Sequence, residues 1–274
     1  MIFETITEIY MTLTKAEKKI ADYIYENKES AQYMSITSLA DECQVAEATI
    51  TRFCKKLGVS GYNALKLAIA RGDTSEENGG SREPKDNMDL KKVYLSEVKA
   101  LKETYEQLSD VDIDRAAHYL HSAQRVYCMG VGGSSVIAME AWARFVTVST
   151  QFQWIQDCHF QAVTASLCNI NDVILYFSYS GSTRDIIDIL KLAREKNAKV
   201  ILVTKFPDSP AAQYADITLI CAPNESPLQS GSIAAKISQL YIIDILFNTY
   251  CKINPQYTNA NRDITARVIA DRLM

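Results

Sequence analysis

The chain has 274 residues, a formal net charge of −4 at pH 7, and an apolar share of 47%. This length accommodates one large domain or two ordinary ones with proper cores, and the charge excludes a protein that is basic over its whole surface without excluding a local basic face. Seven scattered cysteines without paired metal spacing favour reduced thiols, and the lack of a signal peptide or a long apolar run predicts a soluble, cytoplasmic protein that contacts no membrane.

A change of composition divides the chain near residues 73–90. This stretch is polar, charged and rich in glycine and turn formers, and it shows no hydrophobic periodicity, so we interpret it as a linker. Residues 1–72 show helical patterns only, whereas strands alternate with helices in residues 91–274. The sequence therefore predicts an all-α domain followed by an α/β domain with a parallel sheet flanked by helices.

The first domain shows three helix signals in succession. Thr14 with Glu17 three residues later predicts a capping box, and Ser35 predicts the cap of a second, short helix. In the stretch 47–57, the apolar residues Ile50, Phe53, Cys54 and Leu57 share one helical face. Two short helices joined by a tight turn are typical of a helix-turn-helix.

The opposite face of the helix at 47–57 is small, hydroxylic and basic. Five basic residues and no acidic one occur between positions 48 and 72, although nine of each occur over residues 1–72, so the charge is segregated. Such a face fits the major groove, with short side chains at base edges and Arg and Lys at phosphates. The candidate DNA-binding residues are Glu47, Ala48, Thr49, Thr51, Arg52, Lys55 and Lys56. A solvated basic face or a helical interaction module is the alternative.

Three segments of this domain closely resemble the N-terminal helix-turn-helix domain of the RpiR family of bacterial transcription regulators. They are residues 35–40, residues 45–53, and residues 56–62 together with 65–66. In that family the domain precedes a sugar isomerase (SIS) domain. One departure is Ala46, where the family usually has serine. An alanine cannot cap the following helix, which costs about 0.5 to 2 kcal/mol, and it removes a hydroxyl that the resemblance places near a DNA phosphate, so lower DNA affinity is expected.

Two further helices are expected before the sheet. The first, at 88–107, carries an apolar stripe, and we expect it to pack on the second domain or on a partner subunit. The second, at 113–121, carries His118 and His121 three residues apart. Without a third ligand at a suggestive spacing, we interpret them as packing or surface histidines and expect neither a metal nor a cofactor.

The first predicted strand, at 125–129, runs into a glycine-rich loop at 130–135, and a helix is predicted over 136–148. Glycines allow a sharp turn and a close backbone approach to a ligand, and the helix offers its positive end. A dinucleotide-binding fold uses a similar loop. Here Ser135 replaces the third glycine of that fingerprint, and the Gly-Lys-Ser/Thr ending of a nucleotide P-loop is lacking.

A second loop of the same kind, at 178–183, follows the apolar strand 172–177. It packs four serine and threonine hydroxyls into six residues and contains no lysine. Further strands are predicted at 199–204 and 216–220. Both loops then lie at the carboxyl edge of the sheet and can face one crevice that suits an anion. The alternative is that Ser and Gly simply form a good turn and helix cap.

The paired loops, G-x-G-x-S followed by S-x-S-G-x-T, make residues 110–250 similar to the SIS phosphosugar-binding domain. The resemblance implies that the phosphate is held by Ser134, Ser178, Ser180 and Thr183, with close backbone groups from Gly132, Gly133, Gly181 and Ser182. It also places the turn 230–232 beside the sugar, in some members across a dimer.

The SIS fold serves isomerases, lyases and regulators alike, so it does not by itself decide whether the chain is an enzyme. Isomerisation requires an acid or base near the sugar, and Glu140, Asp157, His159 and Glu225 are available, although no spacing singles one out. Because the domain is fused to a DNA-binding domain, we predict a regulator, with repression favoured, that binds an operator and a phosphosugar effector as a homodimer or homotetramer. The alternative is a sugar-phosphate isomerase or lyase with a helical appendage.

Overall fold

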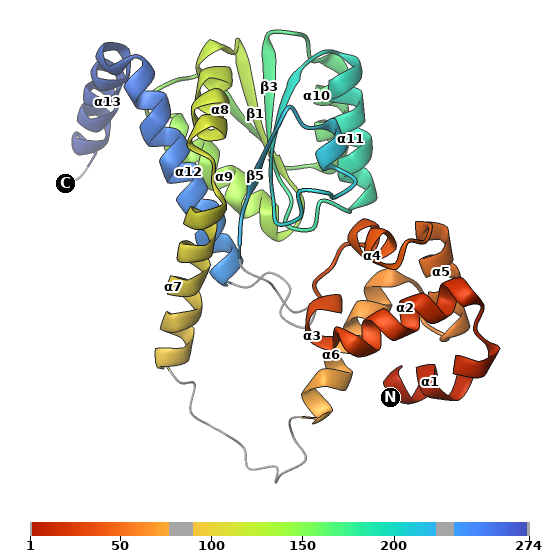
Figure 1. The fold of residues 1–274 in the computed structure, drawn as a ribbon. Coiled ribbons are helices and arrows are strands. Elements are labelled where there is room, and N and C mark those ends of the chain that lie inside the picture. Colours follow the sequence, from red (N-terminus) through yellow and green to blue (C-terminus); the bar gives the residue numbers. More distant parts are fainter. Residues whose placement is uncertain (1, 77–89, 223–232, 273–274) are drawn as a thin grey trace. The chain divides into compact units, whose positions relative to one another are not determined.

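The structure is a computed structural model that describes residues 2–76, 90–222 and 233–272. The described residues separate into two compact units, with the division between Val93 and Tyr94. Figure 1 shows helices alone before the division and a sheet flanked by helices after it. Both predicted fold classes are therefore confirmed.

The first unit is built from six α-helices and one short 3₁₀ turn among its described residues. They are α1 (Ile2–Ile9), η1 (Tyr10–Thr12), α2 (Lys15–Glu26), α3 (Lys28–Ala31), α4 (Ile36–Cys43), α5 (Glu47–Lys56) and α6 (Tyr62–Glu76). Their apolar faces meet in one core that includes Ile24, Leu39, Ile50, Phe53 and Leu65. The last helix extends to Glu76, four residues into the stretch predicted as a linker.

The helix starts predicted at Thr14 and Ser35 in the first unit are confirmed. The backbone N–H of Thr14 donates to Glu17 Oε2 at 2.8 Å while Glu17 N–H donates to Thr14 Oγ1 at 3.3 Å, which completes the capping box of α2. Ser35 caps α4 by accepting from the N–H of Ser38 at 2.9 Å. That helix ends at Gln44, whose φ of 53° is left-handed, and α5 begins three residues later. The pair α4 and α5 thus forms the predicted helix-turn-helix.

The second unit contains a five-stranded sheet and seven helices among its described residues. The strands are β1 (Arg125–Gly130), β2 (Phe152–Ile155), β3 (Asp172–Phe177), β4 (Lys199–Thr204) and β5 (Ile217–Ile220). The helices are α7 (Leu90–Gln107), which begins before the division, α8 (Asp110–Ser122), α9 (Gly133–Phe145), α10 (Cys158–Leu167), α11 (Arg184–Glu195), α12 (Ile233–Ile253) and α13 (Pro255–Ala270), and a short 3₁₀ turn η2 spans Ala212–Tyr214.

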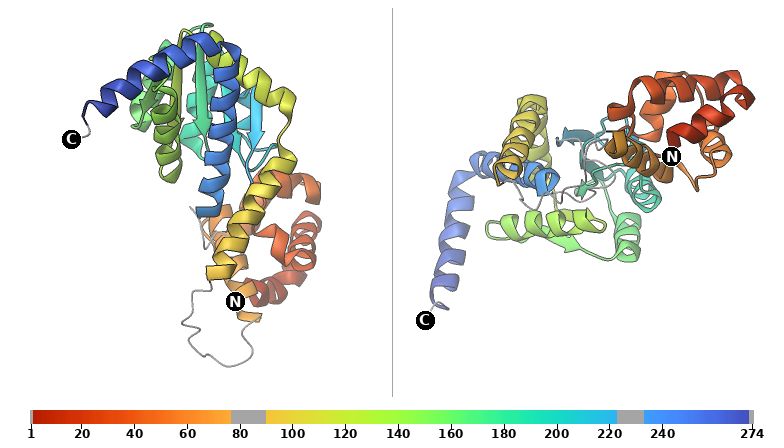
Figure 2. Two further views of the ribbon diagram at one scale, coloured as in Figure 1. Left: turned by 90° about the vertical axis from the view of Figure 1, so that its left-hand side faces the viewer. Right: turned by 90° about the horizontal axis from the view of Figure 1, so that it is seen from below.

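All neighbouring strands pair in parallel in the order β2-β1-β3-β4-β5. Alternate strand residues face opposite sides: Val126 and Cys128 pack with α8, α9 and α12, whereas Tyr127 and Met129 pack with α10 and α11. Figure 2 shows these helical layers on either side of the sheet. The edge strand β2 and the helix α10 were not predicted, since β2 has only four residues.

The predicted apolar stripe of α7 is largely exposed, and the helix packs on the second unit by another face. Ala100 and Thr104 are fully buried in the second unit, where Thr104 Oγ1 donates to the carbonyl of Ala222 at 3.3 Å and accepts from its N–H at 3.1 Å. On the other face, Leu90, Tyr94 and Tyr105 are each more than 60% exposed. The helix therefore packs on the second unit by small residues and leaves its large apolar ones exposed.

No helix in the described ranges is both long enough and apolar enough to cross a membrane.

Candidate functional site

The two candidate loops begin side by side at the carboxyl edge of the sheet. In the pairing of β1 with β3, Gly130 lies opposite Phe177, so both strands end at the same level. The strand order also reverses here, because the chain passes from β1 outward to β2 and then returns to β3 on the other side. Ligands of open α/β sheets bind at such switch points. The structure thus brings together the two loops that the sequence singled out.

The first loop turns abruptly into α9. Gly132 is the N-cap residue with φ 60° and ψ −127°, a conformation that disfavours any residue with a Cβ. The helix begins at Gly133, three residues earlier than predicted, which places Ser134 in its first turn. At Gly130 a Cβ would lie 2.6 Å from the carbonyl oxygen of Ser134, so the turn closes too tightly for a side chain there. Gly132 and Gly133, at the tip of this turn, are exposed.

The second loop is shaped by its own hydroxyls. Ser178 is buried, and its Oγ accepts from the N–H of Gly181 at 3.1 Å, while Ser180 Oγ accepts from the N–H of Ser182 at 3.4 Å. Each serine keeps a hydroxyl proton for donation. Gly181 has φ 57°, which favours glycine. Ser182 and Thr183, which complete the loop, are exposed.

The residues that follow β4 brace this second loop from behind. The N–H of Ser178 donates to the carbonyl of Val203 at 3.0 Å, and Tyr179 accepts from the N–H of Lys205 at 3.0 Å. The carbonyl of Gly181 accepts from the N–H of Ala211 at 2.9 Å. A Cβ on Gly181 would collide with the side chain of Ser209. Backbone hydrogen bonds to β4 and to the residues after it therefore hold the second loop in place. Because Gly181 has no side chain, Ser209 can pack against it.

Both loops leave the following helix uncapped. Among the longer helices whose N-cap residue is described, a side chain caps α2, α4, α8, α10 and α13. For α9, α11 and α5, whose N-cap residues are Gly132, Thr183 and Ala46, the described residues supply no such bond. Among the described residues, no side chain therefore competes with an anion at the start of these three helices, where the helix dipole favours one. In α9 the N–H of Ser134 already donates to the carbonyl of Val131 at 3.2 Å.

A lysine from α12 approaches the first loop. Its Cε lies 3.8 Å from the point that a Cβ on Gly133 would occupy, and the residue is Lys236, in the first turn of α12. No local pattern in the sequence selects this lysine, because it lies about a hundred residues from the first loop and more than fifty from the second, in an apolar stretch. Only the fold places a cation beside the glycine-rich turn.

Three of the four acid and base candidates lie in the described part of the chain. Asp157 caps α10 by accepting from the N–H of Phe160 at 3.1 Å, and with His159 and Asp185 it lines a hollow of about 390 Å³ between α10 and α11. Glu140 is exposed on α9. Glu225 and the turn 230–232 lie outside the described residues. Within the described ranges no cluster of His, Cys, Asp and Glu could hold a metal ion.

The proposed DNA-reading face of α5 is exposed. Ala48, Thr51, Arg52 and Lys55 are all open to solvent, Thr49 is half-buried, and Arg52 Nη2 donates to Thr49 Oγ1 at 3.2 Å. Ile50, Phe53 and Cys54 are buried on the inner face. The buried residues thus anchor α5 in the unit, while its candidate DNA-binding residues face solvent.

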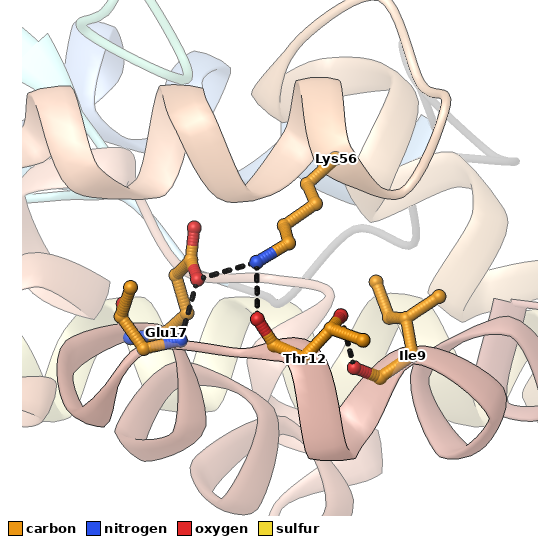
Figure 3. A network of polar contacts seen from close by, with 5 residues as sticks. Ile9, Thr12, Glu17 and Lys56 are labelled. Carbon is orange, nitrogen blue, oxygen red and sulfur yellow. Dashed lines mark hydrogen bonds and ion pairs between the residues drawn. The ribbon is translucent and has the colours of Figure 1, made fainter.

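Two of the candidates on α5 have partners inside the domain. Glu47 Oε1 accepts from Thr37 Oγ1 at 2.7 Å, which joins α5 to α4. Lys56 Nζ donates to the carbonyl of Thr12 at 2.7 Å and to Glu17 Oε2 at 3.0 Å (Figure 3). The backbone N–H of Thr14, together with Lys56, holds the pKa of Glu17 below its ordinary value. Both residues therefore stabilise the unit, and a role for them at DNA remains a prediction.

Comparison with known proteins covers both units. Residues 1–76 match the helix-turn-helix domain of the rpiR family, and residues 119–249 match the SIS domain. An uncharacterized HTH-type transcriptional regulator of Caldanaerobacter subterraneus subsp. tengcongensis is 34% identical over 250 residues, which cover 90% of this chain and 89% of the relative.

Solved structures are similar as well. The Vibrio vulnificus NanR protein complexed with ManNAc-6P shares 26% identity with a TM-score of 0.90, and the match covers 100% of both chains. The sugar isomerase domain of an RpiR transcription factor from Sphaerobacter thermophilus matches 66% of this chain and 99% of its own, with a TM-score of 0.60 and 18% identity, which shows the fold alone.

Proposed function

The chain belongs to the rpiR family of helix-turn-helix transcription regulators, and on that premise we propose that a phosphorylated sugar, bound in its SIS domain, controls its affinity for an operator. The family establishes a transcription regulator with a DNA-binding domain and an SIS domain. The effector, its control of DNA binding and the sign of that control are our proposal. Its place of action is the cytoplasm, where bacterial DNA lies.

The observation that carries the phosphosugar proposal is the pairing of two open helix starts at one switch point. Gly130 and Phe177 end adjacent strands at the same level, and α9 and α11 both begin there without a capping side chain in the described structure. A phosphate at this place receives backbone N–H groups from both helices and hydroxyl protons from Ser134, Ser178, Ser180 and Thr183. A neutral cradle of this kind suits a phosphate monoester.

The sugar is recognised by groups around this cradle. We assign Lys236 to the anion or to a sugar hydroxyl, because its side chain approaches Gly133. The structure of Vibrio vulnificus NanR contains ManNAc-6P and matches this chain over its full length at 26% identity. ManNAc-6P is therefore the first effector to test, within a panel of hexose, hexosamine and pentose phosphates.

We propose that α5 reads DNA through Ala48, Thr49, Thr51, Arg52 and Lys55. Short side chains near its start allow a close approach to base edges, and the two cations lie where phosphates flank the groove. The open N-terminus of α5, which follows Ala46, offers N–H groups to a backbone phosphate.

We propose that the protein binds its phosphosugar without converting it. Asp157 is engaged in capping α10, and the curated relative at 34% identity is named a transcription regulator. An isomerase or lyase needs an acid or base within reach of the carbon-bound proton. Multiple turnovers of any panel member, observed at a physiological rate, would support an enzyme instead.

Control of DNA binding requires two subunits, and we propose a homodimer or homotetramer. The exposed apolar side chains Leu90, Tyr94 and Tyr105 support burial of α7 against another copy. Two recognition helices at a set separation read a roughly palindromic site. A ligand that prefers one arrangement of the subunits shifts that separation, and we propose that it releases a repressor.

Thermal-shift screening of the full chain against the panel tests the effector, since a ligand that binds only the folded state raises the melting temperature with concentration. The hit is then added to the protein bound to duplex DNA selected by the protein from a random pool. We expect one phosphosugar to stabilise the protein and to weaken this complex, while the unphosphorylated sugar does neither. A hit that tightens the complex would reverse the sign, and no hit would reject the effector.

A further inference from the structure

A buried glutamine joins three strand ends directly behind the first loop. Gln161, in the first turns of α10, is fully buried, and its Nε2 donates to the carbonyls of Gly130 at 3.0 Å and Ile155 at 2.8 Å. A longer contact of 3.4 Å reaches the carbonyl of Gln156. These carbonyls belong to the last residue of β1, the last residue of β2 and the residue after it.

The other end of the amide is held by β3. Tyr176 donates its hydroxyl to Gln161 Oε1 at 2.9 Å, and both residues are fully buried. Burial raises the pKa of Tyr176, so its hydroxyl stays protonated at neutral pH and can donate. Because carbonyls surround Nε2 and a hydroxyl proton meets Oε1, only one orientation of the amide satisfies every group.

The position of these contacts gives them a consequence beyond stability. The pairing of β1 with β2 ends at Met129 and Ile155, so Gly130 lies one residue past that ladder and is paired only with β3 on its other side. Gln161 supplies a donor to Gly130 at the point where the first loop begins. The direction of the Gly130 carbonyl sets the peptide plane that leads to Gly132 and the start of α9.

We propose that Gln161 is a positioning residue for the anion site: its amide fixes the Gly130 carbonyl and thereby aims the N–H groups of Gly132 and Gly133, without touching the ligand itself. This inference rests on the proposed function, because it needs the first loop to bind phosphate. Tyr176, which leads from β3 to the second loop, sets the amide in turn and so couples the two loops through one side chain.

The test compares Gln161→Met with Gln151→Met in the full chain. Gln151 lies at the opposite, amino-terminal edge of the sheet, where its Nε2 donates to the carbonyl of Leu120 and its Oε1 accepts from Ser149 Oγ at 3.1 Å. Both substitutions remove an amide that satisfies backbone groups, but only one lies behind the anion site. Tyr176→Phe is the milder third variant, because it removes one hydrogen bond and keeps the donors of Gln161.

The readouts are the affinity for inorganic phosphate, which resembles the phosphoryl group of every candidate effector, the affinity for the phosphosugar found in the screen, and the melting temperature. We expect Gln161→Met to lower both affinities about tenfold and Tyr176→Phe about threefold. Gln151→Met should lose comparable stability and keep both affinities. The amide signals of Gly132 and Gly133 in ¹⁵N spectra should shift in Gln161→Met and Tyr176→Phe and stay unchanged in Gln151→Met.

Wild-type affinity in both Gln161→Met and Tyr176→Phe overturns the inference and leaves the proposed function intact. An equal loss of affinity in Gln151→Met overturns it as well, since any loss of stability would then weaken the site. If Gln161→Met fails to fold, Tyr176→Phe decides alone. A wild-type protein that binds neither phosphate nor any phosphosugar rejects the proposed function instead, and the inference with it.

Discussion

Two regions of this molecule are proposed to bind the same chemical group, a phosphate, by opposite means. On α5 the cations Arg52 and Lys55 stand exposed in solvent. At the sheet edge the two loops contain no charged residue and offer hydroxyls and backbone N–H groups, with Lys236 alone approaching from α12. An exposed cation attracts any polyanion over a Debye length, whereas an oriented neutral donor acts only at contact. Exposed cations therefore suit DNA, and oriented neutral donors suit one small ligand.

The two regions also differ in whether the residues that stabilise the fold are the same ones that are proposed to bind phosphate. In the helical unit, the core face of α5 and the Lys56–Glu17 pair hold the helix, so its outer residues are free to serve DNA. In the loops, the same atoms that form the site also hold it: Ser178 Oγ accepts from Gly181, and Gly181 accepts from Ala211. Substitutions of the outer residues of α5 should therefore change DNA binding without changing stability. Substitutions in the two loops should change both phosphosugar binding and stability.

The largest expected difference is in salt dependence. Two cations on α5 in each of two subunits predict about four phosphate contacts and a slope near −3.6, so DNA affinity should fall more than about a hundredfold between about 50 and 200 mM salt. Phosphosugar affinity should fall by about twofold or less over the same range, because its donors are mostly neutral. Titrations of both ligands on one preparation measure this contrast. Parallel slopes would show that cations dominate both sites.

Gly181→Ala should abolish most phosphosugar binding, with a loss of about thirtyfold or more. The left-handed φ of 57° costs a non-glycine residue about 1–2 kcal/mol, and the new Cβ collides with the side chain of Ser209. Calorimetric titration with the effector measures the loss, and the melting temperature should fall with it.

Ser209 provides the matched control. Its Oγ is buried and has no partner among the described residues, so Ser209→Ala should be nearly neutral. Combined with Gly181→Ala, Ser209→Gly should restore part of the affinity, because it removes the collision and leaves the backbone strain. No recovery in the double variant would mean that strain, and not the collision, closes the site.

Arg52→Ala combined with Lys55→Ala should lower DNA affinity about thirtyfold at low salt and flatten the salt slope, while the melting temperature stays within about 1 °C. Both side chains are exposed, so little packing is lost. Lys56→Ala is the contrasting variant, and it should lower stability by removing its bonds to Thr12 and Glu17. An unchanged slope in the double variant would favour a helical interaction module over a DNA reader.

Much of this arrangement was predictable because its signals are local. The capping box at Thr14, the cap at Ser35 and the inner face of α5 each depend on residues within a few positions of one another. The parallel strands β1 and β3 and the loops after them follow from apolar runs that end in glycine and serine. Their meeting at one edge follows from the general topology of α/β sheets.

The rest depended on contacts between distant segments. The sequence predicts that Lys56 is another cation of the DNA-binding face. In the structure, however, its Nζ donates to Glu17, 39 residues away in the same helical unit. Lys66 counted toward the basic stretch, yet burial lowers its pKa to about 8. Gln161 and Lys236 carry no local pattern, and only the packing of α10 and α12 against the strand ends brings them to the first loop. Site residues of this kind can be identified only from the folded structure.

The Glu17–Lys56 pair makes the stability of the helical unit depend on pH. Because the folded pKa of Glu17 is lowered, its stabilisation is present above the unfolded pKa of about 4.3 and is lost as pH falls through the folded pKa. Glu17→Gln should therefore cost about 1 kcal/mol at neutral pH and progressively less below about pH 4. Urea unfolding of the wild type and the variant at several pH values measures this. A difference that does not change with pH would exclude the ion pair as its cause.

The smallest expected effect is a gain, and it joins the two means of binding phosphate in one position. Ala46 precedes α5 without capping it, so Ala46→Ser adds an acceptor for the open N–H groups and should raise stability by about 0.5–1 kcal/mol. Thermal unfolding measures the gain, and Ala48→Ser, on the exposed face of the same helix, is the matched control that adds a hydroxyl without a cap.

At DNA the two roles of the uncapped start of α5 compete. If the N–H groups bind phosphate directly, the new side chain takes their place and DNA affinity falls; if a phosphate is held by a hydroxyl, affinity rises. Because the departure from serine at this position predicts the weaker binder, we expect a rise of a few-fold, and a fall would assign the phosphate to the backbone, as at α9 and α11.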